Sequence, residues 1–223
     1  MSASDVSASG VSASGWLWII AGPNGSGKST LARSGALQAW HPSIPTVAQS
    51  PDDIAKLLPE AVPGASEFAY VRAAQALSDS LVEAAVVAGR TILVETVGSS
   101  AKFFNLIDLA HEVGRRFGII YVTVEIEALN VARVAHRVAL GGHDVPLDRI
   151  VARRRASFEN FPEFARRADA GLVIDNSLTD RITHKPRPRV LAEKREDEAW
   201  RVMDATVAPV LTHWIAPAVG REQ

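Results

Sequence analysis

The feature that most constrains this chain is a glycine-rich segment, residues 22–30, that follows an apolar run at residues 16–21. It fits the pattern G-x-x-x-x-G-K-[ST], in which glycines let backbone N–H groups converge on an anion. Lys28 can then reach the β- and γ-phosphates of a nucleotide, the Ser29 hydroxyl can ligate Mg²⁺, and a helix beginning near Lys28 adds its positive end. The predicted nucleotide-binding residues are Gly22, Pro23, Asn24, Gly25, Ser26, Gly27, Lys28, Ser29 and Thr30.

The composition indicates which binding partners and which cellular location to expect. The net charge is −1 and the pI is about 6.6, so no global field would recruit nucleic acid or an anionic membrane. The sequence has no cysteine, and no apolar stretch approaches the roughly 20 residues that a membrane span needs. We therefore predict a cytoplasmic protein without nucleic-acid or membrane partners.

The 223 residues, 47% of them hydrophobic, suffice for one substantial core. We predict a disordered tail over residues 1–15, which contain a near repeat of small, polar residues, and a single domain over residues 16–223. A helix rich in Ala and Leu is expected at residues 67–88, ending at Gly89, and a C-terminal packing helix at about residues 191–214.

Strand-like apolar runs alternate with segments of helical periodicity along the domain. Largely apolar strands covered by helices on both faces indicate an α/β fold with a doubly wound parallel sheet. Ligands of such sheets bind beyond the carboxyl ends of the strands. The predicted strands are residues 16–21, 45–48, 91–96, 117–124 and 172–174.

Two acidic residues lie at the end of a predicted strand or shortly after one. Asp52, behind Pro51, is the leading candidate for a base that orients or deprotonates an accepting hydroxyl, as a kinase requires. Alternatively, Asp52 or Asp53 only stabilises the positive N-terminus of the following helix. Glu95 ends a buried strand, where it could reach Mg²⁺ through water or, with Thr96, hold a substrate hydroxyl. Alternatively, Glu95 is only solvated or paired.

Arginines gather in two predicted helices around a Gly141-Gly142-His143 turn. Arg133 and Arg137, four residues apart, share one helix face, and Arg153 lies on the second helix. We predict that residues 133–160 form an arginine-rich lid that neutralises phosphate charge in the transition state. Because the chain has 19 Arg and only 5 Lys, many of these arginines could instead be solvated.

The order and spacing of these motifs over about residues 16–180 resemble the zeta-toxin family of P-loop kinases, chiefly through the Gly-Gly-His-x-Val-Pro turn between arginine-bearing helices. The resemblance implies a P-loop NTPase or kinase fold, ATP and Mg²⁺ as cofactors, phosphorylation of UDP-N-acetylglucosamine, and an antitoxin partner. It implies roles for Asp52 as base, Glu95 as substrate-side acid, and Arg133, Arg137 and Arg153 as phosphate clamps. Val97 stands where the family usually has a hydroxyl residue.

Two functions remain open from the sequence. One is a phosphotransferase that moves the γ-phosphoryl group of ATP, or of GTP, onto a small hydroxyl acceptor. The other is a nucleotide-dependent switch that acts through a protein partner. This function is favoured by Val97 and by the strand at residues 91–96, which resembles a Walker B strand but lacks its usual aspartate. A transporter-type ATPase is disfavoured, because the chain has no Leu-Ser-Gly-Gly-Gln segment.

The segment Asp175-Asn176-Ser177 could line the adenine or form an Asx turn, and we favour the turn.

Overall fold

The computed structural model describes residues 15–141, 145–180, 182 and 186–203. These residues form a six-stranded sheet in the order β2-β1-β3-β4-β5-β6. The four strands from β2 to β4 run parallel, whereas β5 and β6 are antiparallel additions at one edge. The strands are β1 (Trp16–Ala21), β2 (Ile92–Glu95), β3 (Arg116–Thr123), β4 (Ala170–Asp175), β5 (Arg189–Lys194) and β6 (Arg201–Val202).

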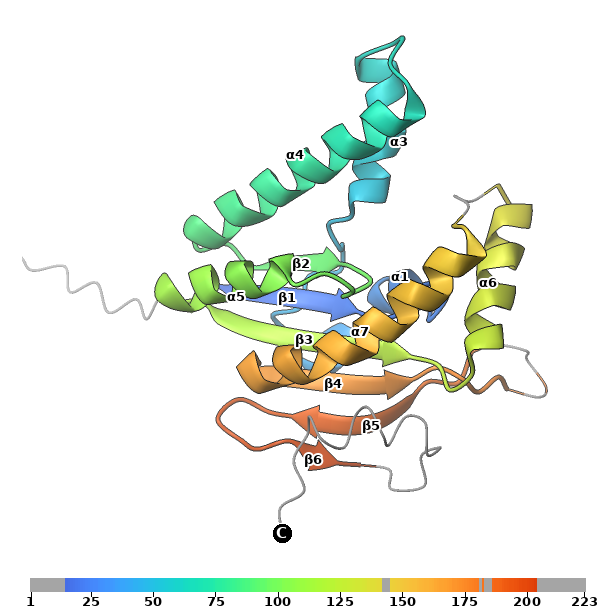
Figure 1. The fold of residues 1–223 in the computed structure, drawn as a ribbon. Helices are drawn as coiled ribbons and strands as arrows, with labels where there is room; N and C mark the ends of the chain where they lie inside the picture. The colour runs from blue at the N-terminus through green and yellow to red at the C-terminus, as the bar shows by residue number, and fades with distance from the viewer. Residues whose placement is uncertain (1–14, 142–144, 181, 183–185, 204–223) are drawn as a thin grey trace, which may run out of the picture.

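Helices cover both faces of the sheet (Figure 1). One face packs against α4, α5 and α7, and the other against α1 and α2. The α3–α4 hairpin projects beyond β2, while α6 and α7 meet near the carboxyl ends of the parallel strands. The helices are α1 (Lys28–Ala32), α2 (Ala36–Trp40), α3 (Pro51–Ala61), α4 (Glu67–Val87), α5 (Lys102–Glu112), α6 (Glu127–Ala139) and α7 (Leu147–Arg167).

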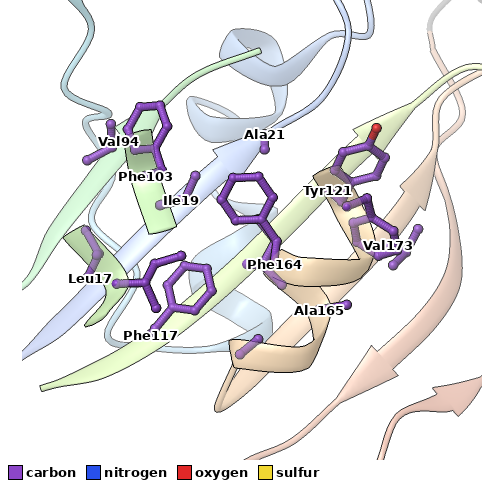
Figure 2. Close-up of a cluster of buried hydrophobic side chains, with 14 of the residues drawn as sticks. Leu17, Ile19, Ala21, Val94, Phe103, Phe117, Tyr121, Phe164, Ala165 and Val173 are labelled. Carbon is purple, nitrogen blue, oxygen red and sulfur yellow. The ribbon is translucent and has the colours of Figure 1, made fainter. Parts of the chain in front are cut away.

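The central strands are apolar on both faces, which is why they lie in the middle of the sheet. All six residues of β1 are buried. Alternate residues of β1 enter the two core clusters, so that Leu17 and Ile19 face α5 and α7 (Figure 2) while Trp18 and Ile20 face α1 and α2. The doubly wound α/β architecture predicted from the sequence is confirmed, with a parallel sheet extended by two antiparallel strands.

The predicted C-terminal helix at residues 191–214 is wrong where the structure describes it. The chain instead forms β5 and β6, and β5 pairs with β4 from Gly171 to Asp175. Leu191 and Ala192 are buried against the sheet. Cross-strand pairing and burial override the helical preference of this Leu-, Ala- and Glu-containing stretch. Residues 204–214 lie outside the described part of the chain.

The predicted strand at residues 45–48 is also wrong. This segment is irregular and touches the sheet through a single bridge between Gln49 and Val94. Pro45 lacks an N–H group and so cannot donate to a ladder.

The predicted helix at residues 67–88 is confirmed as α4, which ends just before Gly89 at φ 72°. Among the helices that the structure describes, none is both long and apolar enough to cross a membrane.

Candidate nucleotide and acceptor site

The loop between β1 and α1, residues 22–27, turns sharply at the carboxyl end of the sheet. Gly22 has φ 141°, and a Cβ atom there would lie 1.9 Å from the carbonyl oxygen of Val122 in β3. Only glycine therefore lets the loop leave β1 so close to the neighbouring strand. The Asn130 side chain in α6 holds the loop from the other side, since its Nδ2 donates to the carbonyl oxygen of Asn24 at 2.6 Å.

Lys28 is the buried charge at the centre of the site, with 7% of its surface exposed. Its Nζ donates to the carbonyl oxygens of Gly22 at 2.8 Å and Pro23 at 3.1 Å. Burial lowers the pKa of Lys28 to about 8, while the negative charge of Glu95 raises it, the positive charge of Arg137 lowers it, and the charge of Asp52 raises it. The fold thus brings residues from β2, α3 and α6 within electrostatic reach of the lysine.

Ser29 and Glu95 form the pair that suits a magnesium ion. The Ser29 hydroxyl donates to Oε1 of Glu95 at 2.7 Å. A hydroxyl beside a single carboxylate, with nucleotide phosphates completing the shell, is a donor set that Mg²⁺ accepts in phosphotransfer sites. No group of three or more His, Cys, Asp or Glu side chains with metal-binding geometry occurs among the described residues. Any metal here would consequently depend on phosphate oxygens for most of its ligands.

Several buried polar atoms around the loop have no hydrogen-bond partner within the part of the chain that the structure describes. They come from the loop itself, from α6 and from the turn after β4, and buried polar atoms normally find a partner. Hydrogen bonds link Arg133 to Asn176 and Asn176 to Ser26, so these atoms lie around the loop, where the oxygens and N–H groups of a bound nucleotide could satisfy them. These atoms are Asn24 Oδ1, Ser26 Oγ, Asn176 Oδ1 and Arg133 Nη1.

The predicted lid arginines differ in their surroundings. Arg133 is partly buried, which lowers its guanidinium pKa, and its Nη2 donates to the carbonyl oxygen of Asn176 at 3.0 Å. Arg137 lies one helical turn further along α6, within electrostatic reach of Lys28. Both α6 arginines therefore lie near the glycine-rich loop or Lys28, whereas Arg153 is half-buried on α7 and its side chain has no hydrogen bond among the described residues.

Three consecutive arginines, Arg153, Arg154 and Arg155, lie on α7. Although the sequence analysis favoured Arg153, the buried one of these is Arg154. Its Nη1 donates to Asn130 Oδ1 at 2.6 Å, and its Nη2 donates to the carbonyl oxygens of Val124 and Glu125, both at 2.9 Å. Arg154 supports Asn130, which in turn holds the loop. Helical periodicity could have found it, because Arg154 shares a helix face with the buried Ile150, Phe158 and Phe161. These core neighbours distinguish it from Arg153 and Arg155.

Asp52 lies in the first turn of α3, whose N-cap is Ser50. The Ser50 Oγ accepts from the Asp52 N–H at 3.3 Å. Asp53 pairs with Lys56 at 2.6 Å on the exposed side of the helix. Asp52 is exposed, and its negative charge raises the pKa of Lys28, whereas Asp53 has no such effect. Asp52 lies in the first turn of α3, so the alternative role predicted for it, stabilising the positive end of the helix, also agrees with the structure.

A pocket of about 340 Å³ opens beside this site, between α4, β2 and α5. Glu95 and Thr96 line it at the sheet end, and Pro51, next to Asp52, lines it at the start of α3. The Thr96 hydroxyl accepts from the Gly98 N–H at 3.1 Å, so it also shapes the turn after β2. The two predicted substrate residues thus border a cavity that adjoins the phosphate-binding loop.

The segment after β4 forms the Asx turn that the sequence favours. Asp175 Oδ1 accepts from the Ser177 N–H at 2.9 Å, and Asp175 Oδ2 accepts from Arg189 at 2.7 Å. Between them, Asn176 Nδ2 donates to the carbonyl oxygen of Ser26 at 2.8 Å. The turn therefore also supports the phosphate-binding loop. Gly142 and His143, from the turn between the arginine helices, lie outside the described residues.

Replacing Gly27 with alanine tests how closely the loop depends on Asn176. Gly27 has φ 98°, and a Cβ atom there would lie 2.3 Å from Asn176 Nδ2. We expect about 1–3 kcal/mol loss of unfolding free energy from strain and the displaced hydrogen bond, together with weaker nucleotide binding. Gly35→Ala is the matched control, because Gly35 has φ 78° but a Cβ atom there would meet no other atom within 4 Å, so it isolates the backbone strain. Urea unfolding and calorimetric ATP titration measure both effects, and equal losses in the two variants would contradict the prediction.

Comparison with known proteins identifies a family and a fold. The family described as zeta toxin matches residues 12–185. The crystal structure of AvrRxo1-ORF1:-ORF2 with ATP aligns with a TM-score of 0.68 at 16% identity, over 92% of this chain and 65% of that one. A structure from the PezAT chromosomal toxin–antitoxin system of Streptococcus pneumoniae aligns with a TM-score of 0.50 at 14% identity, over 73% of this chain and 67% of that one.

At these identities the structural matches show a shared fold. The chain spans only 65% of the length of the AvrRxo1-ORF1 structure that it matches. No curated protein matches the sequence.

Proposed function

Since this chain belongs to the zeta toxin family, whose fold and nucleotide-binding loop are those of kinases, we propose that it transfers the γ-phosphoryl group of ATP to the hydroxyl group of a small molecule. The observation that carries this proposal is the arrangement around Lys28. Glu95 and Asp52 act electrostatically on the Lys28 ammonium group, and Glu95 both accepts from Ser29 and lines the pocket between α4 and α5. A donor phosphate and an acceptor hydroxyl would meet there.

Each residue has a defined role in this proposal. Lys28, Arg133 and Arg137 bind the phosphates and neutralise the charge that develops on the transferred group, with Arg153 as a further candidate from α7. Asp52 orients the acceptor hydroxyl and receives its proton as the oxygen attacks the γ-phosphorus. Ser29 and Glu95 would hold Mg²⁺, which when bound supplies charge neutralisation between the β- and γ-phosphates. Glu95 and Thr96 position the acceptor.

The identity of the acceptor and of any protein partner belongs to the proposal as well. UDP-N-acetylglucosamine, implied by the family resemblance, is the first acceptor to test. An antitoxin partner is supported by the neighbours, which include a complex of AvrRxo1-ORF1 with ORF2 and a toxin–antitoxin system. ATP as donor and the absence of cysteine favour action in the cytoplasm.

A ³¹P NMR time course tests the proposed reaction. Protein and Mg-ATP are followed alone, with UDP-N-acetylglucosamine, and with a pool of small metabolites, and each condition is repeated with Asp52→Asn. We expect a new phosphomonoester resonance whose rate of formation falls about 10²-fold or more in Asp52→Asn, because general-base catalysis contributes at least that much. ATP binding should be retained, since Asp52 is exposed and no hydrogen bond joins its side chain to the loop among the described residues. Slow release of inorganic phosphate without any phosphomonoester would instead favour the nucleotide-dependent switch.

A further inference from the structure

The segment between β2 and α5 carries Thr96, one of the two residues proposed to position the acceptor. Residues 96–99 form neither helix nor strand. Thr96 lines the pocket between α4 and α5, and its hydroxyl oxygen accepts from the Gly98 N–H at 3.1 Å. This contact uses a lone pair of the oxygen and leaves the hydroxyl proton available to a ligand in the pocket. The direction of the Thr96 hydroxyl therefore depends on where Gly98 lies.

Gly98 lies in a narrow space between the end of β1 and α7. Its φ of 73° is in the left-handed region, which favours glycine. A Cβ atom at this position would lie 3.3 Å from the Cβ atom of Ala21 and 3.6 Å from Oγ of Ser157. The path of the segment after Thr96 is thus set by its contacts with the sheet on one side and with α7 on the other.

Two side chains of α7 hold this segment by its backbone. Asn160 Nδ2 donates to the carbonyl oxygen of Gly98 at 3.0 Å, and Ser157 Oγ donates to the carbonyl oxygen of Val97 at 2.7 Å. Ser157 and Asn160 are three residues apart and so lie on one face of the helix. Because both acceptors are backbone carbonyl oxygens, the two contacts fix the course of the chain itself.

Ser157 is in turn oriented by Tyr121 of β3. Its side chain is fully buried, and its Oγ lies 3.0 Å from the Tyr121 hydroxyl oxygen. Since the one proton of Ser157 is donated to the carbonyl oxygen of Val97, the Tyr121 hydroxyl is the donor to Ser157. Burial raises the pKa of Tyr121, so this hydroxyl keeps its proton at neutral pH. A chain of donors therefore runs from β3 through α7 to the segment after β2.

We propose that Asn160 and Ser157 are positioning residues of the phosphotransfer reaction, which hold Val97 and Gly98 so that the Thr96 hydroxyl is directed at the acceptor. The inference rests on the proposed kinase function and adds to it the groups that align the acceptor. Neither Asn160 nor Ser157 is among the residues that line the pocket, so both act through the segment after β2.

The same helix also supports the donor side of the site. Arg154, one turn before Ser157, donates to Asn130 Oδ1 at 2.6 Å, and Asn130 holds the phosphate-binding loop. One helix thus contacts both the support of the donor loop and the segment that carries Thr96. Loss of the Asn160 contact should consequently affect the acceptor and leave the nucleotide contacts intact.

Truncation of Asn160 tests the proposal. The full chain is assayed with saturating Mg²⁺ and γ-³²P-labelled ATP and limiting UDP-N-acetylglucosamine, or a limiting small-metabolite extract where that sugar nucleotide yields no product. We expect Asn160→Ala to lower kcat/KM for the acceptor about tenfold or more, because a displacement of about 1 Å can cost as much as 10²-fold. The ATP KM should stay unchanged, and the Tm should fall by only about 2–4 °C, as for the loss of one hydrogen bond.

Glu159→Ala is the matched control for this variant. Glu159 is exposed on the same helix and pairs with Arg155, so its truncation removes a side chain that does not hold the segment after β2. The control should keep the wild-type kcat/KM for the acceptor. Ser157→Ala, which removes the contact with Val97, is assayed in parallel as a second variant, so that the outcome does not depend on the folding of one protein.

A double-mutant cycle with Thr96→Val separates positioning from a general effect on structure. In the Thr96→Val background, Asn160→Ala should lower the acceptor kcat/KM less than twofold further, because the hydroxyl that Asn160 positions is already absent. Losses that multiply in full, or an unchanged acceptor kcat/KM in both Asn160→Ala and Ser157→Ala, would overturn the inference while the wild-type product still supports the kinase function. A wild-type protein that makes no product from either acceptor source would overturn the kinase function, and this inference with it.

Discussion

The Lys28→Met protein is expected to lose about 10³-fold in the rate of phosphotransfer, because it lacks the buried ammonium group that would neutralise the transferred phosphate. Lys28 Nζ is positioned by the carbonyl oxygens of Gly22 and Pro23, so its geometry exists before nucleotide binds. Steady-state kinetics with saturating Mg-ATP measure the loss. Arg33→Met, an exchange of an exposed cation just beyond α1, is the control and should retain the wild-type rate.

The same variant should remain folded, which separates lost catalysis from lost structure. Burial lowers the pKa of Lys28 from 10.5 to about 8, a difference that corresponds to a cost of about 3 kcal/mol for folding with the charged lysine. The unfolded chain binds more protons than the folded chain between these two pKa values, so wild-type stability rises as the pH increases from about 8 to 10.5. Below about pH 8 the full cost applies, and methionine avoids it.

Urea unfolding at several pH values checks the predicted direction of this pH dependence of stability. At pH 7 the Lys28→Met protein should be at least as stable as the wild type, and the difference should shrink as the pH is raised toward 10. Saturating ATP should reverse the order at pH 7, because phosphates stabilise the charged lysine of the wild type alone. A variant that unfolds at pH 7 would contradict the view that Lys28 serves the ligand rather than the fold.

Arg154→Met should produce the largest loss of stability. Arg154 is 6% exposed, and its guanidinium group satisfies Asn130 Oδ1 and two backbone carbonyl oxygens after β3. Methionine fills the space but leaves these acceptors without donors. We expect a loss of about 3–5 kcal/mol, the range for breaking a buried charged network, and a fall in Tm of about 10 °C for a domain of this size.

The neighbouring Arg155 provides the control for that experiment. Arg155 is exposed on α7 and, among the described residues, pairs only with Glu159, at 2.8 Å. Exposed pairs of this kind contribute little, so Arg155→Met should leave the Tm almost unchanged. Calorimetry on the two variants measures the contrast. Comparable Tm values would mean that the hydrogen bonds of Arg154 add no net stability.

The local conformation of the glycine-rich loop, β1, α4 and the Asx turn could be predicted from the sequence alone. The glycine-rich loop is a local structure, since Lys28 binds carbonyl oxygens only five and six residues before it, and short-range spacing predicts such contacts. The apolar run of β1 and the periodicity of α4 likewise reflect burial within one element, and both elements were predicted nearly to their ends. The Asx turn at Asp175 is local for the same reason.

Features that depend on distant partners became visible only in the folded chain. The segment from residue 189 to 194 became a strand because β4 offers it an antiparallel edge, which outweighs its local helical preference. Among three consecutive arginines, Arg154 was selected because its helix face meets Asn130 and the end of β3, about 24 to 30 residues away in sequence. The pocket between α4 and α5 likewise joins Asp79 and Lys102, 23 residues apart, across two helices. Such pairings are set by packing between elements, about which local spacing carries little information.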